Sequence, residues 1–297
     1  MKPIHLILLL AGALLAAPRL RAEAPVKTKE DMLKLVQGLK RRQGEIELRN
    51  GVAKLNVPKE FDYLDQEDAQ TVLVKLWGNP PGLKTLGLLM PADMSPLAPD
   101  CWVVTISFVE DGFVRDNDAS KINYDDLLKK MQKGAHDANA GRLKQGYPSV
   151  EILGWAAPPR YDAASHKLYW AKEVQFGGRE KKTLNYDIRI LGRRGVLVLD
   201  AVASIDRLDA IQQQVPNILG MVNFKQGHAY ADFNPKVDKV ATYGIAALVA
   251  GGIAAKLGLF KGLLVFLVAA KKLLILGVLA MASFFKKLFS KNKNKKE

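Results

Sequence analysis

Two apolar stretches flanked by basic residues, one at each end, constrain this 297-residue chain more than any other feature. The N-terminal stretch runs from Ile4 to Ala17 and lies between Lys2 and Arg19. A basic start, a short apolar core and a small-residue end are typical of a secretory signal peptide. We therefore expect residues 1–22 to be a signal peptide that is removed on export. The alternative is an uncleaved N-terminal anchor.

The C-terminal stretch is longer and is interrupted by lysines. A helix over residues 241–268 is long enough to cross a bilayer, which takes about 20 residues, with Lys256 and Lys261 facing protein or reaching towards the membrane surface. The next apolar run is too short to cross, so residues 273–289 are expected to form an interfacial helix bracketed by lysines. Residues 290–297 form a basic tail.

The net charge of +14 is unevenly distributed along the chain. Ten of these charges lie in residues 236–297, whereas residues 23–235 are nearly balanced. A nucleic-acid-binding domain carries its basic face on the folded part, so we exclude nucleic acid as a partner. Lysines collect on the cytoplasmic side of membrane helices. One crossing therefore predicts a bacterial inner-membrane protein with its domain on the periplasmic side and its tail in the cytoplasm. Two crossings would place the tail outside.

Small residues recur at a spacing of four in the predicted membrane helix: Ala247, Gly251 and Ala255, and again Gly258 and Gly262. This spacing lets two helices approach closely. It predicts a homo-oligomer that forms through the membrane helix, in addition to contact with the lipid bilayer. The alternative is that these residues reflect only the general richness of membrane helices in glycine and alanine.

The region between the two ends, residues 27–235, reads as one exported α+β domain, an antiparallel sheet of six to eight strands with packed helices. Residues 183–191 alternate between apolar and polar side chains, which predicts a strand with one covered face and one wet face. Residues 196–203 are apolar on both sides and predict a central strand. Asn50-Gly51 predicts a hairpin, while Asp65, Asn123 and Asp206 are expected to cap helices.

No arrangement of residues indicates catalysis, a cofactor or a metal. Cys101, the one cysteine, lies in an apolar run with no histidine beside it, so it does not fit an activated nucleophile. The histidines have no zinc-binding spacing, and the acidic residues near Ser120 do not fit a calcium loop. We therefore expect neither a catalytic site nor a cofactor, and no metal.

One segment is a candidate for contact with an envelope protein. Residues 154–162 are expected to form a stiff, aromatic-rich loop, and exposed aromatics on rigid loops favour partner contact. The alternative is that its aromatic side chains fold back over the core. The candidate partner-binding residues, including one in the following strand, are Trp155, Pro158, Pro159, Arg160, Tyr161 and Trp170.

Asp200 is a lone charge in the predicted central strand, where burying it without a partner would be costly. A structural ion pair with Arg189 or Arg193 would satisfy it. A second hypothesis pairs Asp200 with Glu173 from a neighbouring strand, because paired carboxylates can perform acid–base catalysis.

Several longer segments carry a resemblance to a known family. The chain resembles the bacterial membrane-anchored proteins of domain-of-unknown-function family 2167, over nearly all of the expected mature sequence. The resemblance implies a prokaryotic, membrane-anchored protein, and it implies no activity, ligand or catalytic residue. The segments that carry it are residues 76–81, 154–162, 166–173, 183–186, 192–199 and 230–235.

Together these features predict an envelope protein held by a transmembrane helix, which acts as a non-enzymatic interaction or scaffold module. Two alternatives stay open. The first is a carboxylate-dependent enzyme that acts on an envelope substrate. The second is an accessory subunit in membrane assembly or transport.

Overall fold

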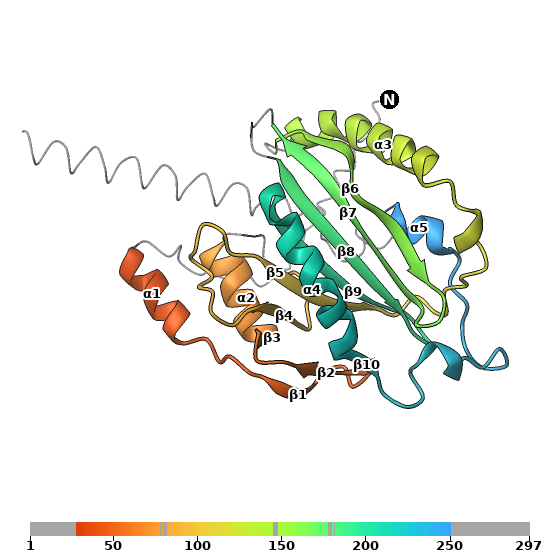
Figure 1. Cartoon of the computed structure of the whole chain (residues 1–297), viewed down its shortest axis with the longest axis horizontal. Helices are drawn as coiled ribbons and strands as arrows, with labels where there is room; N and C mark the ends of the chain where they lie inside the picture. Colours follow the sequence, from red (N-terminus) through yellow and green to blue (C-terminus); the bar gives the residue numbers. More distant parts are fainter. Residues whose placement is uncertain are drawn as a thin grey trace, which may run out of the picture.

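The computed structural model describes residues 28–77, 79, 82–144, 148–177, 180 and 182–250. Within this part, the chain forms an α+β fold with two antiparallel sheets (Figure 1). The larger sheet has seven strands in the order β3-β4-β5-β9-β8-β7-β6, and the smaller has three in the order β1-β2-β10. The α+β class and the antiparallel pairing are thus confirmed.

The strands are β1 (Gly44–Glu47), β2 (Ala53–Val57), β3 (Phe61–Asp65), β4 (Gly87–Pro91), β5 (Val103–Val109), β6 (Val150–Asp162), β7 (Lys167–Phe176), β8 (Thr183–Leu191), β9 (Val196–Ser204) and β10 (Val222–Phe224). The helices are α1 (Lys29–Gln37), α2 (Gln66–Gln70), α3 (Tyr124–Lys144), α4 (Leu208–Met221) and α5 (Ile245–Val249). A π-helical segment, η1 (Thr71–Leu76), extends α2. Short 3-10 turns are η2 (Ala119–Lys121), η3 (Ile205–Arg207) and η4 (Tyr230–Asp232).

Local sequence signals account for several of these elements. Gly51 has a φ of +71° in the turn that joins β1 to β2, as the Asn-Gly pair predicts. Asp65 accepts hydrogen bonds from the backbone of Glu67 and Asp68, and so caps α2. Asn123 caps α3 in the same way. The prediction for Asp206 is wrong, because α4 begins at Leu208 after a 3-10 turn.

The two faces of the large sheet are covered by different elements. Consecutive residues of a strand point to opposite faces, so Leu199 and Val198 of β9 belong to separate apolar clusters. The first cluster includes Ile211 and Val215 of α4, which lies across the sheet (Figure 1). The second includes Leu248 of α5. α3 runs along β6 at the sheet edge and completes this second layer.

The face of β8 that was predicted to be solvent-exposed is buried. Residues 184, 186, 188 and 190 are buried, as expected, but Asp187 and Arg189 on the other face are only 4% and 2% exposed. The alternation therefore separates an apolar buried face from a polar buried face. The reason is the second layer, since α3 and α5 cover the side of the sheet that the polar residues face.

Residues 154–162 are also not a loop. They continue β6, the edge strand, which pairs with β7 through three register shifts. Such bulges allow a strand that contains Pro158 and Pro159 to stay in the sheet, since proline is tolerated at edges and bulges. The stiffness expected of this segment therefore comes from sheet pairing.

The folded body extends beyond its predicted boundary at residue 235. Phe113 bridges to Val240, and both Ile245 and Ala246 donate backbone hydrogen bonds to Asp118. Ile245 itself is fully buried. Residues 241–250 consequently pack with the described domain, whereas residues 251–268 of the predicted membrane helix lie outside the described residues.

Among the described residues, no helix is both long enough and apolar enough to cross a bilayer. Of the predicted membrane-packing residues, Ala247 lies in α5, whereas Gly251, Ala255, Gly258 and Gly262 lie outside the described part of the chain. The expected signal peptide, the interfacial helix 273–289 and the tail 290–297 also lie outside it.

Candidate functional site

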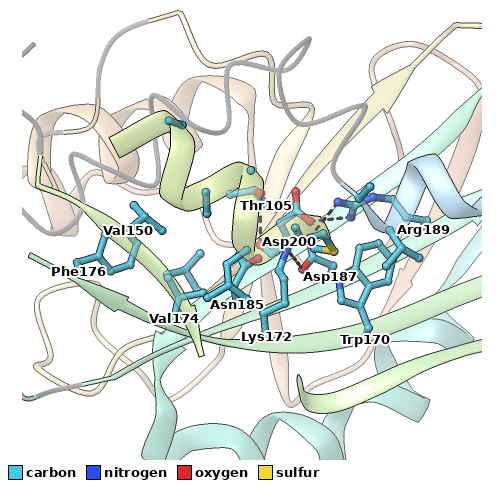
Figure 2. A pocket seen from close by; sticks show the side chains of 18 of the residues that line it. Thr105, Val150, Trp170, Lys172, Val174, Phe176, Asn185, Asp187, Arg189 and Asp200 are labelled. Atoms are coloured by element: carbon cyan, nitrogen blue, oxygen red, sulfur yellow. Dashed lines mark hydrogen bonds and ion pairs between the residues drawn. The ribbon is translucent and has the colours of Figure 1, made fainter. Parts of the chain in front are cut away.

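A row of polar side chains crosses the large sheet on the face beneath α3. The antiparallel register places Trp170 of β7 opposite Asp187 of β8, Asp187 opposite Asp200 of β9, and Asp200 opposite Thr105 of β5. Residues two apart in a strand share a face. Lys172 and Arg189 therefore flank this row on the same side of the sheet (Figure 2).

Arg189 joins the two carboxylates. Its Nη1 donates to Oδ1 of Asp200 at 2.6 Å, and its Nη2 donates to Oδ1 of Asp187 at 3.0 Å. The ammonium of Lys172 lies 3.0 Å from Oδ2 of Asp187. Of the two predicted partners for Asp200, the structure thus confirms Arg189. Arg193 instead forms an ion pair with Asp238.

The cluster is balanced in charge and almost completely buried. Burial raises the pKa of Asp200 to about 6, with a further contribution from the neighbouring Asp187 carboxylate, and Arg189 opposes this rise. Burial alone would lower the pKa of Arg189, but the two carboxylates outweigh it and raise that pKa. Two cations and two carboxylates therefore face one another with little exposure to solvent.

Four buried polar atoms of this cluster have no hydrogen-bond partner in the protein: Oδ2 of Asp187, Oδ2 of Asp200, Nε of Arg189 and Nε1 of Trp170. Of these, Oδ2 of Asp187 lies in an ion pair with Lys172. Buried polar groups are nearly always hydrogen-bonded, so each unpaired atom requires an explanation. The two carboxylate oxygens are the costliest of the four, because they carry charge. A proton shared between the carboxyl groups of Asp187 and Asp200 would satisfy both of these oxygens, and the contact between the two groups also raises the pKa of Asp200.

The cluster forms part of the lining of a cavity of about 730 Å³ between the sheet and α3 (Figure 2). Apart from the cluster, its lining is mainly apolar. Leu73 and Trp77 contribute from the η1 side, and Val249 and Ala250 contribute from the end of α5. At the opposite end from Arg189 the lining is formed by Val150, Val174 and Phe176. The cavity is therefore polar at one end and apolar at the other.

The cavity exists because the inward face of α3 carries small side chains. Gly134, Ala135 and Ala138 line it, and a Cβ added at Gly134 would meet no atom within 4 Å. α3 is nevertheless fixed over the sheet. The amide of Asn139 donates to the carbonyl of Val150 at 3.1 Å and accepts from its N–H at 2.8 Å. The cavity therefore lies beneath a helix that is fixed to the sheet by hydrogen bonds.

The predicted partner-binding residues are dispersed. Trp155 and Tyr161 are half-buried and pack against the second apolar cluster, so these aromatics do fold back over the core. Trp170 is 1% exposed and lines the cavity. Of the remaining candidates, Pro158 and Arg160 are exposed to solvent, whereas Pro159 is buried.

The hypothesis that Glu173 works with Asp200 is wrong. Glu173 neighbours Lys172 in β7 and so points to the opposite face of the sheet, where it pairs with Lys182. The carboxylate that does lie beside Asp200 is Asp187. Sequence reasoning missed it because residue 187 was assigned to a solvent-exposed face.

Cys101 is buried, and burial raises the pKa of its thiol to about 12. The thiolate is the nucleophile, so this cysteine is inert at neutral pH. Within the described ranges, no group of three or more His, Cys, Asp or Glu side chains could hold a metal ion.

A second polar cluster links the turn between β6 and β7 to the C-terminal segment. The Tyr161 hydroxyl donates to Oδ2 of Asp116 at 2.5 Å and lies 3.1 Å from Nδ1 of His166. His166, with a φ of +52°, stacks on Tyr230. Burial raises the pKa of Tyr161, and so does its bond to Asp116. These contacts fix residue 230 and its neighbours to the body of the domain.

Comparisons with solved structures give distant matches. Three solved structures resemble this chain: PsbP (CyanoP) from the cyanobacterium Synechocystis sp. PCC 6803, the Ran-binding protein Mog1p from Saccharomyces cerevisiae, and LpqN, involved in cell envelope biogenesis, from Mycobacterium tuberculosis. Their sequence identities are 12%, 11% and 12%, with TM-scores of 0.34, 0.33 and 0.30. The matches cover 63%, 66% and 68% of this chain and 92%, 100% and 99% of theirs.

A search of curated proteins gives no match. The family comparison is more informative, because one model matches residues 40–282, which include the sheets, α3 and the polar cluster. That model is described as a protein of unknown function, DUF2167. The chain therefore belongs to the DUF2167 family.

Proposed function

We propose that this protein is an exported, membrane-held binding module, without enzymatic activity, whose cavity beneath α3 takes up an amphipathic ligand. The observation that carries the proposal is the cavity itself, a mainly apolar space of about 730 Å³ that ends on the buried, charge-balanced cluster of Asp187, Asp200, Arg189 and Lys172. Ligand sites are typically apolar cavities of about 300–1,000 Å³ with a few placed polar groups.

The size of the cavity favours a ligand larger than a simple metabolite. An apolar protein cavity of about 150 Å³ is enough to hold benzene. A space several times larger with one polar end suits a molecule that has an apolar chain and a polar head. Filling it would bury apolar surface on both the ligand and the protein.

The position of the cavity in the chain favours a lipid source. Val249 and Ala250 line it, and the apolar residues expected to enter the membrane follow directly in the sequence. In the proposed arrangement, the domain lies on the periplasmic side of the bacterial inner membrane and the lysine-rich tail lies in the cytoplasm. Since α5 belongs to the domain, the membrane segment would begin after residue 250. The cavity would then lie close to the bilayer surface.

A second candidate function is a carboxylate-dependent enzyme. It is favoured by the raised pKa of Asp200 beside Asp187, since a carboxyl group that titrates near neutral pH can act in acid–base catalysis. We rank it second because Arg189 holds one oxygen of each carboxylate, as in a structural ion-pair network. Chemical change in a ligand on incubation with wild-type protein, but not with Asp200→Asn, would reverse this ranking.

The test of binding is lipid analysis of the purified full-length protein by mass spectrometry. Ala135→Phe places a ring in the cavity, whereas Ala140→Phe places the same ring on the exposed side of α3. We expect a bound amphipathic molecule in the wild type and in Ala140→Phe, and its loss from Ala135→Phe. Equal lipid content in all three proteins would refute the proposal.

The topology has its own test. A C-terminal alkaline-phosphatase fusion should be inactive, because the enzyme folds only when it is exported. An active fusion would overturn the single crossing. Cross-linking in cells from the exposed Pro158 and Arg160 would show whether an envelope protein also contacts the domain.

A further inference from the structure

We propose that the ligand of this cavity is an amphiphile with a single carboxylate head, as in a free fatty acid, and that this head binds between the ammonium of Lys172 and the side-chain amide of Asn185. The inference rests on the proposed function and adds the chemistry of the head group. Two independent observations carry it: a pair of donor side chains that face the cavity from adjacent strands, and a surplus of positive charge in the cavity lining.

Lys172 and Asn185 are direct neighbours on the cavity face of the sheet. The register of β7 and β8 places these two residues opposite each other, and both line the cavity. Side chains that lie opposite each other in an antiparallel pair have Cβ atoms about 4.5–5.5 Å apart. Figure 2 shows Asn185 beside Lys172, between Val174 and the charged cluster. One small head group can therefore contact both side chains.

Both side chains have donors that a ligand can use. The ammonium of Lys172 lies 3.0 Å from one oxygen of Asp187, and the Lys172 side chain is 14% exposed. An ammonium group carries three N–H donors, so donors remain after this contact. Asn185 is half-buried, and its amide has no hydrogen-bond partner among the described residues. That amide is not one of the unpaired groups that the protein encloses completely, so it is accessible from the cavity.

The lining of the cavity carries more positive than negative charge. Four cations and two carboxylates line it, and β5, β6, η1 and α5 add no charged side chain. The surplus is therefore two positive charges, or three if the two carboxyl groups share a proton. An anionic head lowers this surplus and a cationic head raises it, and uncompensated charge away from water is costly. The charged lining residues are Lys130, Arg142, Lys172, Arg189, Asp187 and Asp200.

Of the four cations, Lys172 is the one best placed to bind a head group. Arg189 is held by the two carboxylates. Arg142 donates twice to one backbone carbonyl, at 3.1 and 2.8 Å, and so fixes the C-terminal end of α3. Lys130 is exposed, so solvent screens its charge. Without Lys130 the lining still has more cations than carboxylates, and the ammonium of Lys172 has donors to spare.

The two donor groups favour a carboxylate over other head groups. A carboxylate has two oxygens, of which one can accept from the ammonium and the other from the amide. A phosphate monoester brings three acceptor oxygens and close to two negative charges, which is more than these two groups satisfy. A neutral head could pair with the amide but would leave the positive surplus unchanged.

The apolar end of the cavity sets the direction of the alkyl chain. Figure 2 shows Val150, Val174 and Phe176 at the end away from Arg189. With the head at Lys172, a chain that reaches Phe176 would follow β7 for about 13 Å, since a strand rises about 3.3 Å per residue. The reverse orientation would leave the carboxylate without these two donors, and an unpaired buried charge is costly.

The test compares four probes with the same brominated alkyl chain: a carboxylic acid, its primary amide, a phosphate monoester and a primary amine. Bromine quenches tryptophan fluorescence at short range, and Trp77 and Trp170 line the cavity. The full-length protein is held in phosphatidylcholine nanodiscs in weakly alkaline buffer, which keeps the acid ionised. Only quenching that an excess of the unbrominated probe reverses is counted. We expect the acid to bind roughly ten- to a hundred-fold more tightly than the amide, as for a hydrogen bond to a charged group. The phosphate and the amine should also bind less tightly than the acid.

The outcomes separate the inference from the function on which it rests. If the amide binds as tightly as the acid, or the phosphate or amine binds most tightly, the carboxylate assignment is overturned while the cavity remains a ligand site. If none of the four probes gives reversible quenching, the proposed function itself fails. These arms use the wild-type protein and do not depend on whether a variant folds.

Two variants locate the head group. We expect Lys172→Met to bind the acid and the amide equally, and Asn185→Leu to bind the acid roughly ten-fold more weakly than wild type does. The matched control is Lys182→Met, which removes an ion pair with Glu173 on the opposite face of the sheet and should bind as the wild type does. A preference for the acid that persists in Lys172→Met, or that is lost in Arg142→Met instead, would overturn the assignment.

Discussion

Replacing Arg189 with methionine tests the charge cluster most directly. Methionine approximates the length of the arginine stem but removes the hydrogen bonds to Asp200, Asp187 and the carbonyl of Ile188. Two carboxylates that are 4% and 7% exposed would then remain, with Lys172 as their nearest cation. Breaking a buried ion pair by removing one partner costs about 3–5 kcal/mol. We expect Arg189→Met to lose that much stability at neutral pH.

The loss should depend on pH in a defined direction. Arg189 opposes the rise in the pKa of Asp200, so removing it raises that pKa further above its value in the unfolded chain. A carboxyl group whose pKa is raised by folding costs stability at pH values above its folded pKa, and protonation relieves this cost as the pH falls. The difference between Arg189→Met and wild type should therefore shrink as the pH falls towards about 6, where the variant is already protonated at Asp200, and change little below it.

The assay is thermal unfolding of the full-length protein in detergent micelles, followed by tryptophan fluorescence. The control is Lys133→Met, which removes an ion pair with Asp137 on the exposed side of α3 and should cost at most about 1 kcal/mol. Adding Asp187→Asn and Asp200→Asn to Arg189→Met should recover part of the loss. The reasoning is refuted if Arg189→Met melts like Lys133→Met, or if its deficit is the same across the pH range.

Three further predictions concern packing and titration. Gly195→Ala should destabilise the domain by about 1–3 kcal/mol in thermal melts, because its Cβ would lie 2.1 Å from the carbonyl oxygen of Val109; Gly154→Ala, with open space around it, is the control. Burial would raise the pKa of Asp116, but its hydrogen bonds outweigh burial and lower that pKa. Asp116→Asn should therefore have a lower melting temperature than wild type at neutral pH. The two melting temperatures should become equal in acid, where the wild-type carboxylate is protonated and its stabilising contribution is lost. Leu248→Asp should detach α5 and open residues 236–250 to proteolysis.

Much of the fold could be predicted from local sequence, because it depends on short-range chemistry. An Asn-Gly turn requires a positive φ, and a side-chain oxygen at residue 65 or 123 satisfies the free N–H groups of a helix start. The central position of β9 followed from apolar residues on both of its sides. These signals act over a few residues, so they are independent of how distant segments pack.

The polar face of β8 could not be predicted in this way. Alternation indicates that the two faces of a strand differ, but it does not indicate what covers each face. The cover comes from α3, some 50 residues earlier, and from α5, more than 50 residues later. The burial of Asp187 and Arg189 therefore depends on tertiary contacts. So does the choice of Asp187, and not Glu173, as the neighbour of Asp200, because strand order and register decide it.

The packing of residues 241–250 against the domain could not be predicted for a related reason. A protein core and a bilayer interior select the same apolar side chains, so Ile245, Leu248 and Val249 are compatible with either. The two environments are distinguished here by a polar contact with a distant residue, because Asp118 accepts hydrogen bonds from the first turn of α5. That contact spans more than 120 residues of sequence and has no local signature.

One signal of the cavity was nevertheless present in the sequence. The apolar stripe of α3 begins with large side chains at Leu127 and Met131 and then shrinks to Ala135 and Ala138. A helix that packs tightly on a sheet needs bulk along its whole inward face, because protein interiors are close-packed. A stripe that turns small while the helix remains tethered, here through Asn139, must leave space beneath it. A helix whose inward side chains become small, packed over a strand with charged residues on the facing side, therefore predicts a cavity that is lined by charged groups on the sheet.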